Sequence, residues 1–402
     1  MRPSRMIAVV GLSLVPLTAV PFQPAASDTV PSPATTTLLD WQQLAIQTVY
    51  VDGRVVFPPS TTPVAPPPPV APVYLGFTAL AVHNAVETAA RGTASASAAI
   101  AKSAHDVLEH YFPNTEATLD AALAATLAKV PDGPAQRKGV RIGRQAAAEL
   151  IASRAGEVLG GSVPYTLDTT QPGVWTPPPT GMLASWLGYM KPLVIQDPVD
   201  LPGPDALTSA DYAADLAEVK LLGNKAGTNT THKAIADFYF ANSTATYERA
   251  LVTYLRTHPI GVRKAAKMFA VMNVAMTDGI REAWRLKHQV GLWRPVQAIN
   301  ATDPTWEPYK ATPPYSEYPS GHAVFTGAFA ETVRMYLGNA VPLTLVSVPS
   351  APLPSRSYST LSGLESEAFM ARIYSGIHFR HAMDDGYYLA HETVHKVASA
   401  IG

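Results

Sequence analysis

The chain has 402 residues, of which 47% are hydrophobic and 15% charged, so it has ample material for one large folded domain or for two or three smaller ones. Its formal net charge of −1 gives no sign of binding to nucleic acid or another polyanion. The absence of cysteine excludes disulfides, thiolate metal sites, iron–sulfur clusters and covalently attached haem.

Residues 1–27 have the pattern of a secretory signal peptide. Arg2 and Arg5 precede an apolar run, and small residues then form a cleavage site before Asp28. At about 17 residues, with two prolines inside it, the run is a poor membrane anchor. No later stretch is long and apolar enough to cross a bilayer, so we expect a secreted, extracellular protein whose mature part is not embedded in a membrane.

Helical patterns dominate the rest of the chain. After a short helix expected over 40–51, a proline-rich run from Pro58 to Pro72 predicts an extended polyproline strap. The connection 157–207 is rich in Gly, Pro and Trp and has no sustained period. Apolar spacing predicts helices at about 74–90, 95–111, 115–129, 135–156, 208–222, 230–240, 244–257, 260–286, 321–337, 363–375 and 381–400.

These patterns predict an all-α protein built of helical bundles with about ten or more helices. We find no repeat of fixed period and no alternating runs that would make a sheet. The expected organisation is the leader 1–27, an N-terminal segment 28–73 with the strap, and a single all-α domain 74–402. Within that domain we expect a helical half 74–156, the connection 157–207 and a half 208–402 that carries the site.

The segment from Tyr318 to His322 ends one element and begins the next. Pro319 stops any preceding helix, Ser320 is a good N-cap, and Gly321 leaves free N–H groups uncovered. His322 then lies on the apolar face of the following helix, together with Phe325, Phe329, Val333 and Leu337. Such a helix start is often only a cap, but an inward imidazole needs a partner.

Three cations occur at breaks in structure within apolar sequence. Lys287 continues the apolar stripe of a helix that starts near Ile260; a lysine there often extends its ammonium to water instead. Arg294 precedes Pro295, and Arg372 lies near the end of a helix that Gly376 terminates.

If these cations converge on the turn at Ser320, they form a pocket for a tetrahedral oxyanion, because buried cations without an anion would be severely destabilising. His322 and His378 would lie on opposite sides of the bound atom. One would attack or coordinate it, and the other would transfer protons.

This set of motifs resembles the superfamily of vanadium-dependent haloperoxidases and type 2 phosphatidic acid phosphatases. Three blocks in order carry the resemblance: Lys287 with Arg294-Pro295, then Pro319-Ser320-Gly321-His322, then Arg372 with His378. The stretches at 172–175, 217–220, 293–296 and 376–380 are similar to the soluble bacterial haloperoxidase-like branch. The resemblance covers nearly everything after residue 40.

The resemblance implies that vanadate is the cofactor and that its oxygens are held by Lys287, Arg294, Ser320, Gly321 and Arg372. It further implies that His378 bonds to vanadium and that His322 is the acid–base. The small-molecule substrates would be hydrogen peroxide, a halide and an organic acceptor. Relatives are often homo-oligomers.

A phosphatase of the same superfamily is the alternative, without vanadate. His378 would be the nucleophile and His322 the acid in hydrolysis of a phosphate monoester. One pocket suits both because five-coordinate vanadate has the shape and charge of a phosphoryl-transfer transition state. The secreted chain and the additional helices favour the haloperoxidase.

The chain departs from the superfamily pattern in two places. Ala382 stands where many relatives have an Asp that orients the second histidine, so we expect Asp384 or Asp385 to orient His378 instead. Tyr315 stands at the position that lies on the halide side in haloperoxidases, and it leaves the halide preference open.

Two other hypotheses follow from the sequence. His391-Glu392-Thr393-Val394-His395 fits a zinc-peptidase pattern, although no third ligand follows it and its apolar spacing is that of an ordinary terminal helix. A protein that binds an oxyanion without catalysis is the non-enzyme alternative, which the substitution at Ala382 allows.

Overall fold

The computed structural model describes residues 30–57, 60–157, 159–227, 229–240, 243–348 and 351–402. The expected signal peptide, 1–27, lies outside them. The described residues form thirteen α-helices, which confirms the all-α class. No helix among them is both long and apolar enough to cross a membrane. The α-helices are α1 (Pro33–Gln47), α2 (Ala71–Ala90), α3 (Ala96–Tyr111), α4 (Glu116–Leu127), α5 (Pro134–Ser153), α6 (Ala210–Leu222), α7 (Thr230–Phe240), α8 (Ser243–Thr257), α9 (Val262–Val290), α10 (Pro295–Asn300), α11 (Gly321–Leu337), α12 (Leu361–Tyr374) and α13 (Arg380–Ala400).

Several short elements have a geometry that the sequence did not predict, although 48–51 was expected to be helical. A π-helical turn, η1 (Thr48–Asp52), continues α1, and 3₁₀ turns form at η2 (Pro113–Thr115) and η3 (Ser185–Tyr189). The antiparallel strands β1 (Leu343–Leu345) and β2 (Arg356–Tyr358) pair in a small hairpin, so the expectation of no sheet was wrong here. These strands are too short for the period-two pattern that would have revealed them.

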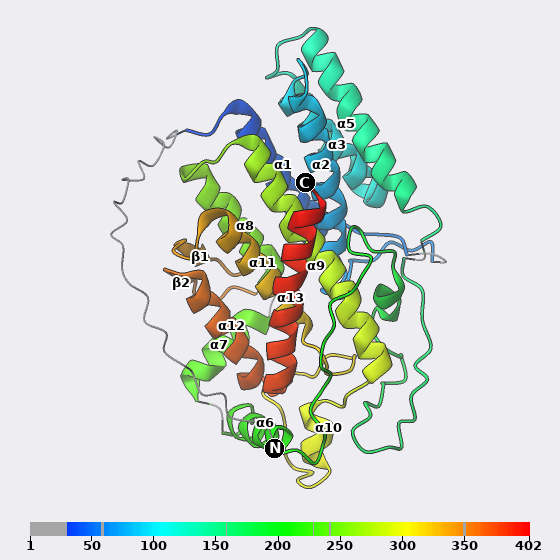
Figure 1. Ribbon diagram of the computed structural model, residues 1–402, viewed down its shortest axis with the longest axis vertical. Coiled ribbons are helices and arrows are strands. Elements are labelled where there is room, and N and C mark those ends of the chain that lie inside the picture. The colour runs from blue at the N-terminus through cyan, green and yellow to red at the C-terminus, as the bar shows by residue number, and fades with distance from the viewer. Residues whose placement is uncertain (1–29, 58–59, 158, 228, 241–242, 349–350) are drawn as a thin grey trace, which may run out of the picture.

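Three helices run side by side through the middle of the molecule: α9, α11 and α13 (Figure 1). Two glycines permit their close approach. A Cβ atom at Gly279 of α9 would lie 2.9 Å from Val324 of α11, and one at Gly327 of α11 would lie 2.8 Å from Ala390 of α13. The start of α11 is therefore enclosed between two helices, so polar groups there must find partners within the protein.

Other helices pack around this centre. Helix α2 packs on α9, while α3 and α5 pack on α2 at the upper end in Figure 1, and α6 and α10 lie at the opposite end. Helix α1 begins earlier than expected, at Pro33, because Ser32 caps it by accepting a hydrogen bond from the Thr35 N–H. One main hydrophobic core extends from Leu38 of α1 to Val397 of α13.

The irregular connection 157–207 wraps along the outside of α9 and is fastened to it by Asp278. The backbone N–H groups of Leu193, Val194 and Ile195 donate hydrogen bonds of 2.7–2.9 Å to the Asp278 carboxylate. Further along, the Trp284 indole N–H donates to the Leu183 carbonyl oxygen at 3.0 Å. The connection is thus ordered by buried polar contacts, and η3 is its one helical element among the described residues.

Replacing Asp278 by alanine is expected to lower the free energy of unfolding by about 3 kcal/mol, because three buried N–H groups would lose their acceptor. The loss would be measured by urea denaturation. The matched control is Asp132→Ala, which removes an exposed carboxylate and should change stability by less than about 0.5 kcal/mol. Equal effects of the two substitutions would contradict the role assigned to Asp278.

Candidate functional site

The turn before α11 is buried and rigid. Ser320 is fully buried and caps the helix, its Oγ accepting a hydrogen bond from the Ala323 N–H, as expected from the sequence. Its own N–H donates to the Ala382 carbonyl oxygen of α13 at 2.9 Å. A Cβ atom at Gly321 would lie 2.9 Å from the Trp284 ring, so only glycine fits there. The positive end of the α11 dipole therefore opens at a fixed place, which favours an anion.

Lys287 points inward. It is fully buried, and its Nζ donates hydrogen bonds to the carbonyl oxygens of Ser316 (2.9 Å) and Glu317 (2.8 Å). The alternative in which this ammonium extends to water is therefore wrong. Burial, reinforced by the nearby Arg294 guanidinium, holds the pKa of Lys287 well below its usual range.

Arg294 is also fully buried and lies between two backbone segments. Its Nε donates to the Tyr315 carbonyl oxygen at 2.8 Å, and its Nη1 donates to that of Ile377 at 2.7 Å. The same Nη1 lies 3.2 Å from Nε2 of His378. Its Nη2 has no hydrogen-bond partner among the described residues. One guanidinium nitrogen is thus buried and free to bind a ligand.

The Arg372 guanidinium is buried near the ring of Phe240, 5.9 Å from the ring centroid. All three of its guanidinium nitrogens lack a hydrogen-bond partner in the described part of the chain, although the side chain is only 1% exposed. Burial, with a contribution from Arg294, lowers the pKa of Arg372 to about 10. Because a buried guanidinium normally binds several acceptors, this side chain is set up to hold an oxyanion.

His378 is held by the buried carboxylate of Glu317. Its Nδ1 lies 2.7 Å from Oε1 of Glu317, which also accepts a hydrogen bond from the Phe379 N–H at 2.9 Å. Since Nε2 accepts from Arg294, the proton belongs on Nδ1, where it is donated to Glu317. Burial raises the pKa of Glu317 to about 7 against the opposing effect of Arg294 and Lys287.

The expectation that Asp384 or Asp385 orients His378 was wrong. Asp385 instead accepts a hydrogen bond from the Tyr318 hydroxyl, and Asp384 lies near Arg380 at the surface. Ala382 is buried in an apolar cluster, so its small side chain suits that position. The sequence showed Glu317 only as a lone carboxylate just before the Ser320 motif. No local pattern linked it to His378, so it was missed.

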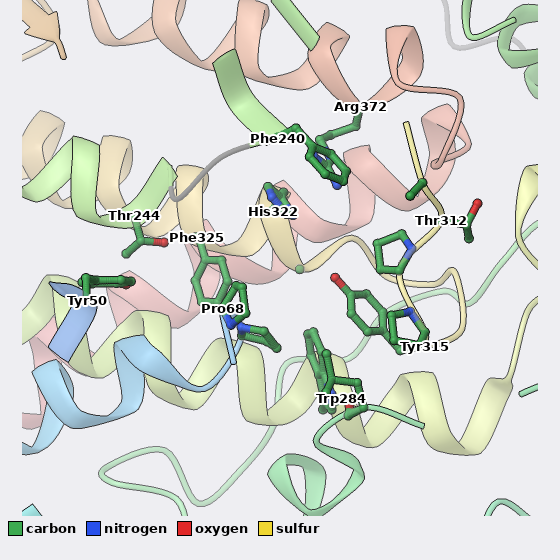
Figure 2. A pocket seen from close by; sticks show the side chains of 16 residues that line it. Tyr50, Pro68, Phe240, Thr244, Trp284, Thr312, Tyr315, His322, Phe325 and Arg372 are labelled. Atoms are coloured by element: carbon green, nitrogen blue, oxygen red, sulfur yellow. Dashed lines mark hydrogen bonds between the residues drawn. The ribbon is translucent and has the colours of Figure 1, made fainter. Parts of the chain in front are cut away.

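His322 completes the site from α11. It is half-buried and lines a cavity together with Arg372, Tyr315 and Trp284 (Figure 2). Burial, and then the charge of Arg372, holds the pKa of His322 well below its usual range. The same causes, burial first, depress the pKa of His378. Both imidazoles are therefore neutral at neutral pH, with a lone pair available to bind or accept a proton.

The structure brings together all seven residues that the sequence assigned to the oxyanion pocket, and it adds Glu317. The three buried basic groups outnumber by two the single buried carboxylate that acts on them electrostatically, that of Glu317. A tetrahedral dianion at the start of α11 would balance that excess and would give acceptors to the free nitrogens of Arg294 and Arg372. Vanadate and phosphate both fit these donors.

The zinc-peptidase alternative is contradicted. His391 Nε2 contacts Glu365 at 3.1 Å and His395 Nε2 contacts Glu331 at 3.1 Å. The Arg334 guanidinium pairs with both glutamates, which puts a cation where the metal would have to be. The helix buries Ala390, Val394 and Val397, as an ordinary amphipathic helix does.

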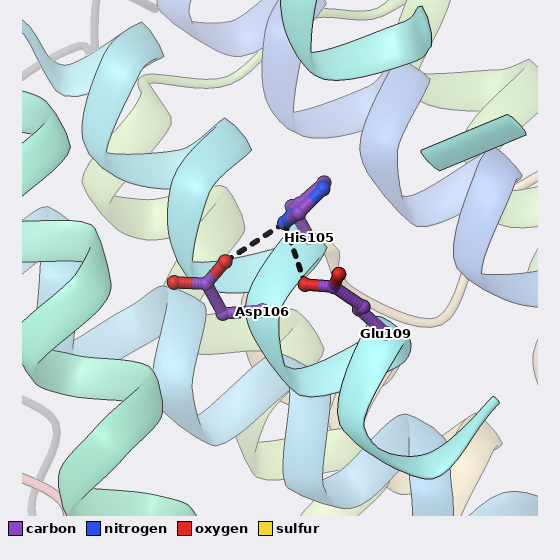
Figure 3. A group of neighbouring side chains, drawn as sticks. All are labelled: His105, Asp106 and Glu109. Carbon is purple, nitrogen blue, oxygen red and sulfur yellow. Dashed lines mark hydrogen bonds and ion pairs between the residues drawn. The ribbon is translucent and has the colours of Figure 1, made fainter. Parts of the chain in front are cut away.

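One group of potential metal ligands occurs elsewhere among the described residues: His105, Asp106 and Glu109 of α3 (Figure 3). Both ring nitrogens of His105 are already bonded, Nδ1 to Asp106 at 2.8 Å and Nε2 to Asp120 at 2.9 Å. The Lys102 ammonium also lies 2.7 Å from the Asp106 carboxylate. The group is thus an ion-pair network that joins α3 to α4.

Stability is expected to depend on pH through His105. Burial lowers the pKa of His105, but the hydrogen bonds to Asp106 and Asp120 outweigh it, so the pKa is raised. The stabilising charge is fully present below the unfolded pKa of about 6.5 and is lost as pH rises through the folded value. His105→Phe should therefore lower the free energy of unfolding more at pH 5.5 than at pH 9. The exposed His258→Phe should show no such difference in urea denaturation.

The helices, the capped turn and the buried cations define a class: all-α proteins with a cationic pocket at the start of a central helix. Residues 300–401, which include the turn, Arg372 and His378, match the family profile of the VCPO second helical-bundle domain. Vanadium chloroperoxidase of Curvularia inaequalis is 34% identical over 94 residues, which are 19% of this chain and 15% of that protein. The chain therefore matches only a small part of the length of this curated relative.

Solved structures extend the similarity to the whole fold. A bacterial vanadium-dependent iodoperoxidase superposes with a TM-score of 0.72 at 20% identity, over 92% of this chain and 96% of that one. A holo-type bacterial vanadium-dependent chloroperoxidase gives a TM-score of 0.61 at 14% identity, over 94% of each chain. The chain has the vanadium-haloperoxidase fold, and the resemblance stated from its motifs is confirmed.

Proposed function

We propose that this protein is a vanadate-dependent haloperoxidase that uses hydrogen peroxide to oxidise a halide. The observation that carries the proposal is the buried Arg372 guanidinium, which has no hydrogen-bond partner among the described residues and lies beside two neutral imidazoles. Such a group needs an oxyanion to be tolerable in the interior. The similarity to haloperoxidase structures along the whole fold supports vanadate as that oxyanion.

The residues around the turn would each bind the anion in a different way. Arg294 and Arg372 would bind oxygens with their free nitrogens, Lys287 would add charge, and Ser320 and Gly321 would contribute a hydroxyl and an N–H. The His378 Nε2 lone pair would serve as the nitrogen ligand. Bound vanadate would supply the Lewis acid that activates hydrogen peroxide towards a halide.

The protein's own side chains prepare this chemistry. Glu317 holds the His378 ring and keeps its proton on Nδ1, which leaves Nε2 free of a proton. His322, neutral and facing the cavity, can accept a proton from incoming hydrogen peroxide and return it to a leaving oxygen. Tyr315 contacts Arg294 and Lys287 with its ring, and we propose that it borders the halide side.

The proposal is tested by two assays run side by side. Protein loaded with vanadate should brominate or iodinate a phenol when hydrogen peroxide and the halide are added. The phosphatase alternative predicts instead that vanadate-free protein hydrolyses p-nitrophenyl phosphate and that vanadate inhibits this hydrolysis. Phosphatase activity without any peroxidase activity would overturn the proposal, and inactivity in both assays would favour the non-catalytic oxyanion-binding protein.

We also propose that the protein is exported, on the pattern of residues 1–27. N-terminal sequencing of protein recovered outside the cell should begin near Asp28. An intact leader on that protein would contradict cleavage.

Light scattering of the mature chain would test the expectation that it forms a homo-oligomer.

A further inference from the structure

A second cavity forms an open groove between α12 and α13 (Figure 1). Its volume is about 460 Å³, which is in the range of cavities that bind small organic molecules. Among the described residues, none that lines this groove borders the cavity beside His322. The walls of the α12–α13 groove include Glu365, Ser366 and Phe369 of α12 and Asp384, Tyr387 and His391 of α13. The groove is therefore a candidate binding site separate from the one already described.

Aromatic rings form the apolar part of the groove. Phe369 and Tyr387 are nearly parallel, with 16° between their planes and 6.0 Å between their centroids. The Tyr387 hydroxyl donates a hydrogen bond of 3.1 Å to the Glu365 carbonyl oxygen, which fixes that ring. Both rings are half-buried and pack on a cluster that includes Ile373 and Met383. An apolar group can therefore pack on this wall without the cost of ordering it first.

Two carboxylates share the guanidinium of Arg380. Its Nε and Nη2 donate hydrogen bonds of 2.9 and 2.5 Å to Glu218. Asp384, which is exposed and lines the groove, interacts with the same guanidinium through its charge. The guanidinium is thus already bonded to Glu218, and the Asp384 carboxylate is open to a further cation.

The guanidinium of Arg334 is likewise shared, by Glu331 and Glu365, and Glu365 lines the groove. Around the groove, two guanidinium groups thus interact with four carboxylates. Arg380 is the single guanidinium or ammonium group that lines it in the described part of the chain. Such a surplus of carboxylates attracts a cation and repels an anion.

We propose that the α12–α13 groove binds a small organic cation, an ammonium group attached to an aromatic or other apolar body. The ammonium pairs with the Asp384 carboxylate and lies near the ring of Tyr387, which attracts a cation through its face. The apolar body packs on Phe369 and on Met370, which also lines the groove. The inference goes beyond the proposed function, because it involves neither the oxyanion site nor peroxide.

Binding is tested on vanadate-free protein with 2-phenylethylamine, which carries an ammonium group, and with neutral 2-phenylethanol, which has a similar shape. Titration calorimetry should show saturable binding of the amine. In saturation-transfer NMR, an equal concentration of the alcohol should fail to displace the amine, because it cannot pair with a carboxylate.

Two variants place the amine in the groove. Asp384→Asn removes the charge and should weaken binding of the amine about 10-fold or more. Ser366→Trp, at an exposed position of α12, should block the groove and weaken binding at least as much. The controls are Asp132→Asn and Ala152→Trp, which make the same kinds of change at exposed positions elsewhere and should leave the affinity unchanged. Thermal unfolding of each variant shows whether it is folded.

Loss of affinity in both groove variants and in neither control would support the proposal. No binding of the amine, or its displacement by the alcohol, would overturn it. Loss in Ser366→Trp alone would mean that the groove does not select a cation, and loss in Asp384→Asn alone would place the amine outside the groove, so either result would also overturn it. These titrations use neither vanadate nor peroxide, so they succeed or fail independently of the haloperoxidase proposal.

Discussion

Replacing Arg372 by methionine is expected to raise the stability of the vanadate-free protein and to abolish its stabilisation by vanadate. The rise follows because methionine fills a similar space without burying an unpaired charge. The loss follows because the three free nitrogens of Arg372 no longer bind the anion. At a concentration 100 times the dissociation constant, vanadate should stabilise the wild-type protein by about 2.7 kcal/mol and the variant by a negligible amount.

Thermal unfolding with and without vanadate measures both effects, and titration calorimetry gives the affinity. Arg144→Met is the matched control, because Arg144 is exposed on α5. That variant should be stabilised by vanadate as the wild type is. If Arg372→Met retained wild-type affinity for vanadate, the oxyanion site would have to lie elsewhere.

Replacing Glu317 by glutamine is expected to weaken vanadate binding by about 10- to 100-fold, with a similar loss of peroxidase rate. Glutamine keeps the shape and can still accept a hydrogen bond from His378. It removes the negative charge that makes the Nε2 lone pair a strong ligand. Calorimetric titration with vanadate measures the loss independently of turnover.

Asp384→Asn is the control for this experiment, because Asp384 was one of the two candidates, with Asp385, that the sequence offered for the same role. The structure places it beside Arg380, away from the histidine, so its amide variant should bind vanadate as the wild type does. A large effect of Asp384→Asn with none of Glu317→Gln would reverse the assignment made from the structure.

Much of the fold could be predicted because the sequence pattern of a helix is local. The apolar spacing on α9 identified its buried face and placed Lys287 on it, and the Ser320 cap marked the start of α11. These features depend on neighbours three or four residues apart. The short helix α10 and the β1–β2 hairpin are too brief to show a period, and tertiary contacts determine them.

The residues of the candidate site likewise include some that could be predicted from the sequence and others that could not. The residues within its three motifs could be named from the sequence, because their spacing is fixed by the turns and helix ends that carry them. The partner of His378 could not, because Glu317 reaches it across 61 residues through packing that no local pattern records. The walls of the cavity come from still more distant segments, from Tyr50 to Arg372.

The proline-rich strap has a consequence for how such a protein can diversify. Pro68 and Pro69 border the cavity, although they come from a segment far in sequence from the residues that form the oxyanion pocket. A chain with this layout can change which compounds it admits by substitutions in that segment alone. The composition of that segment can thus vary while the residues that form the oxyanion pocket stay the same.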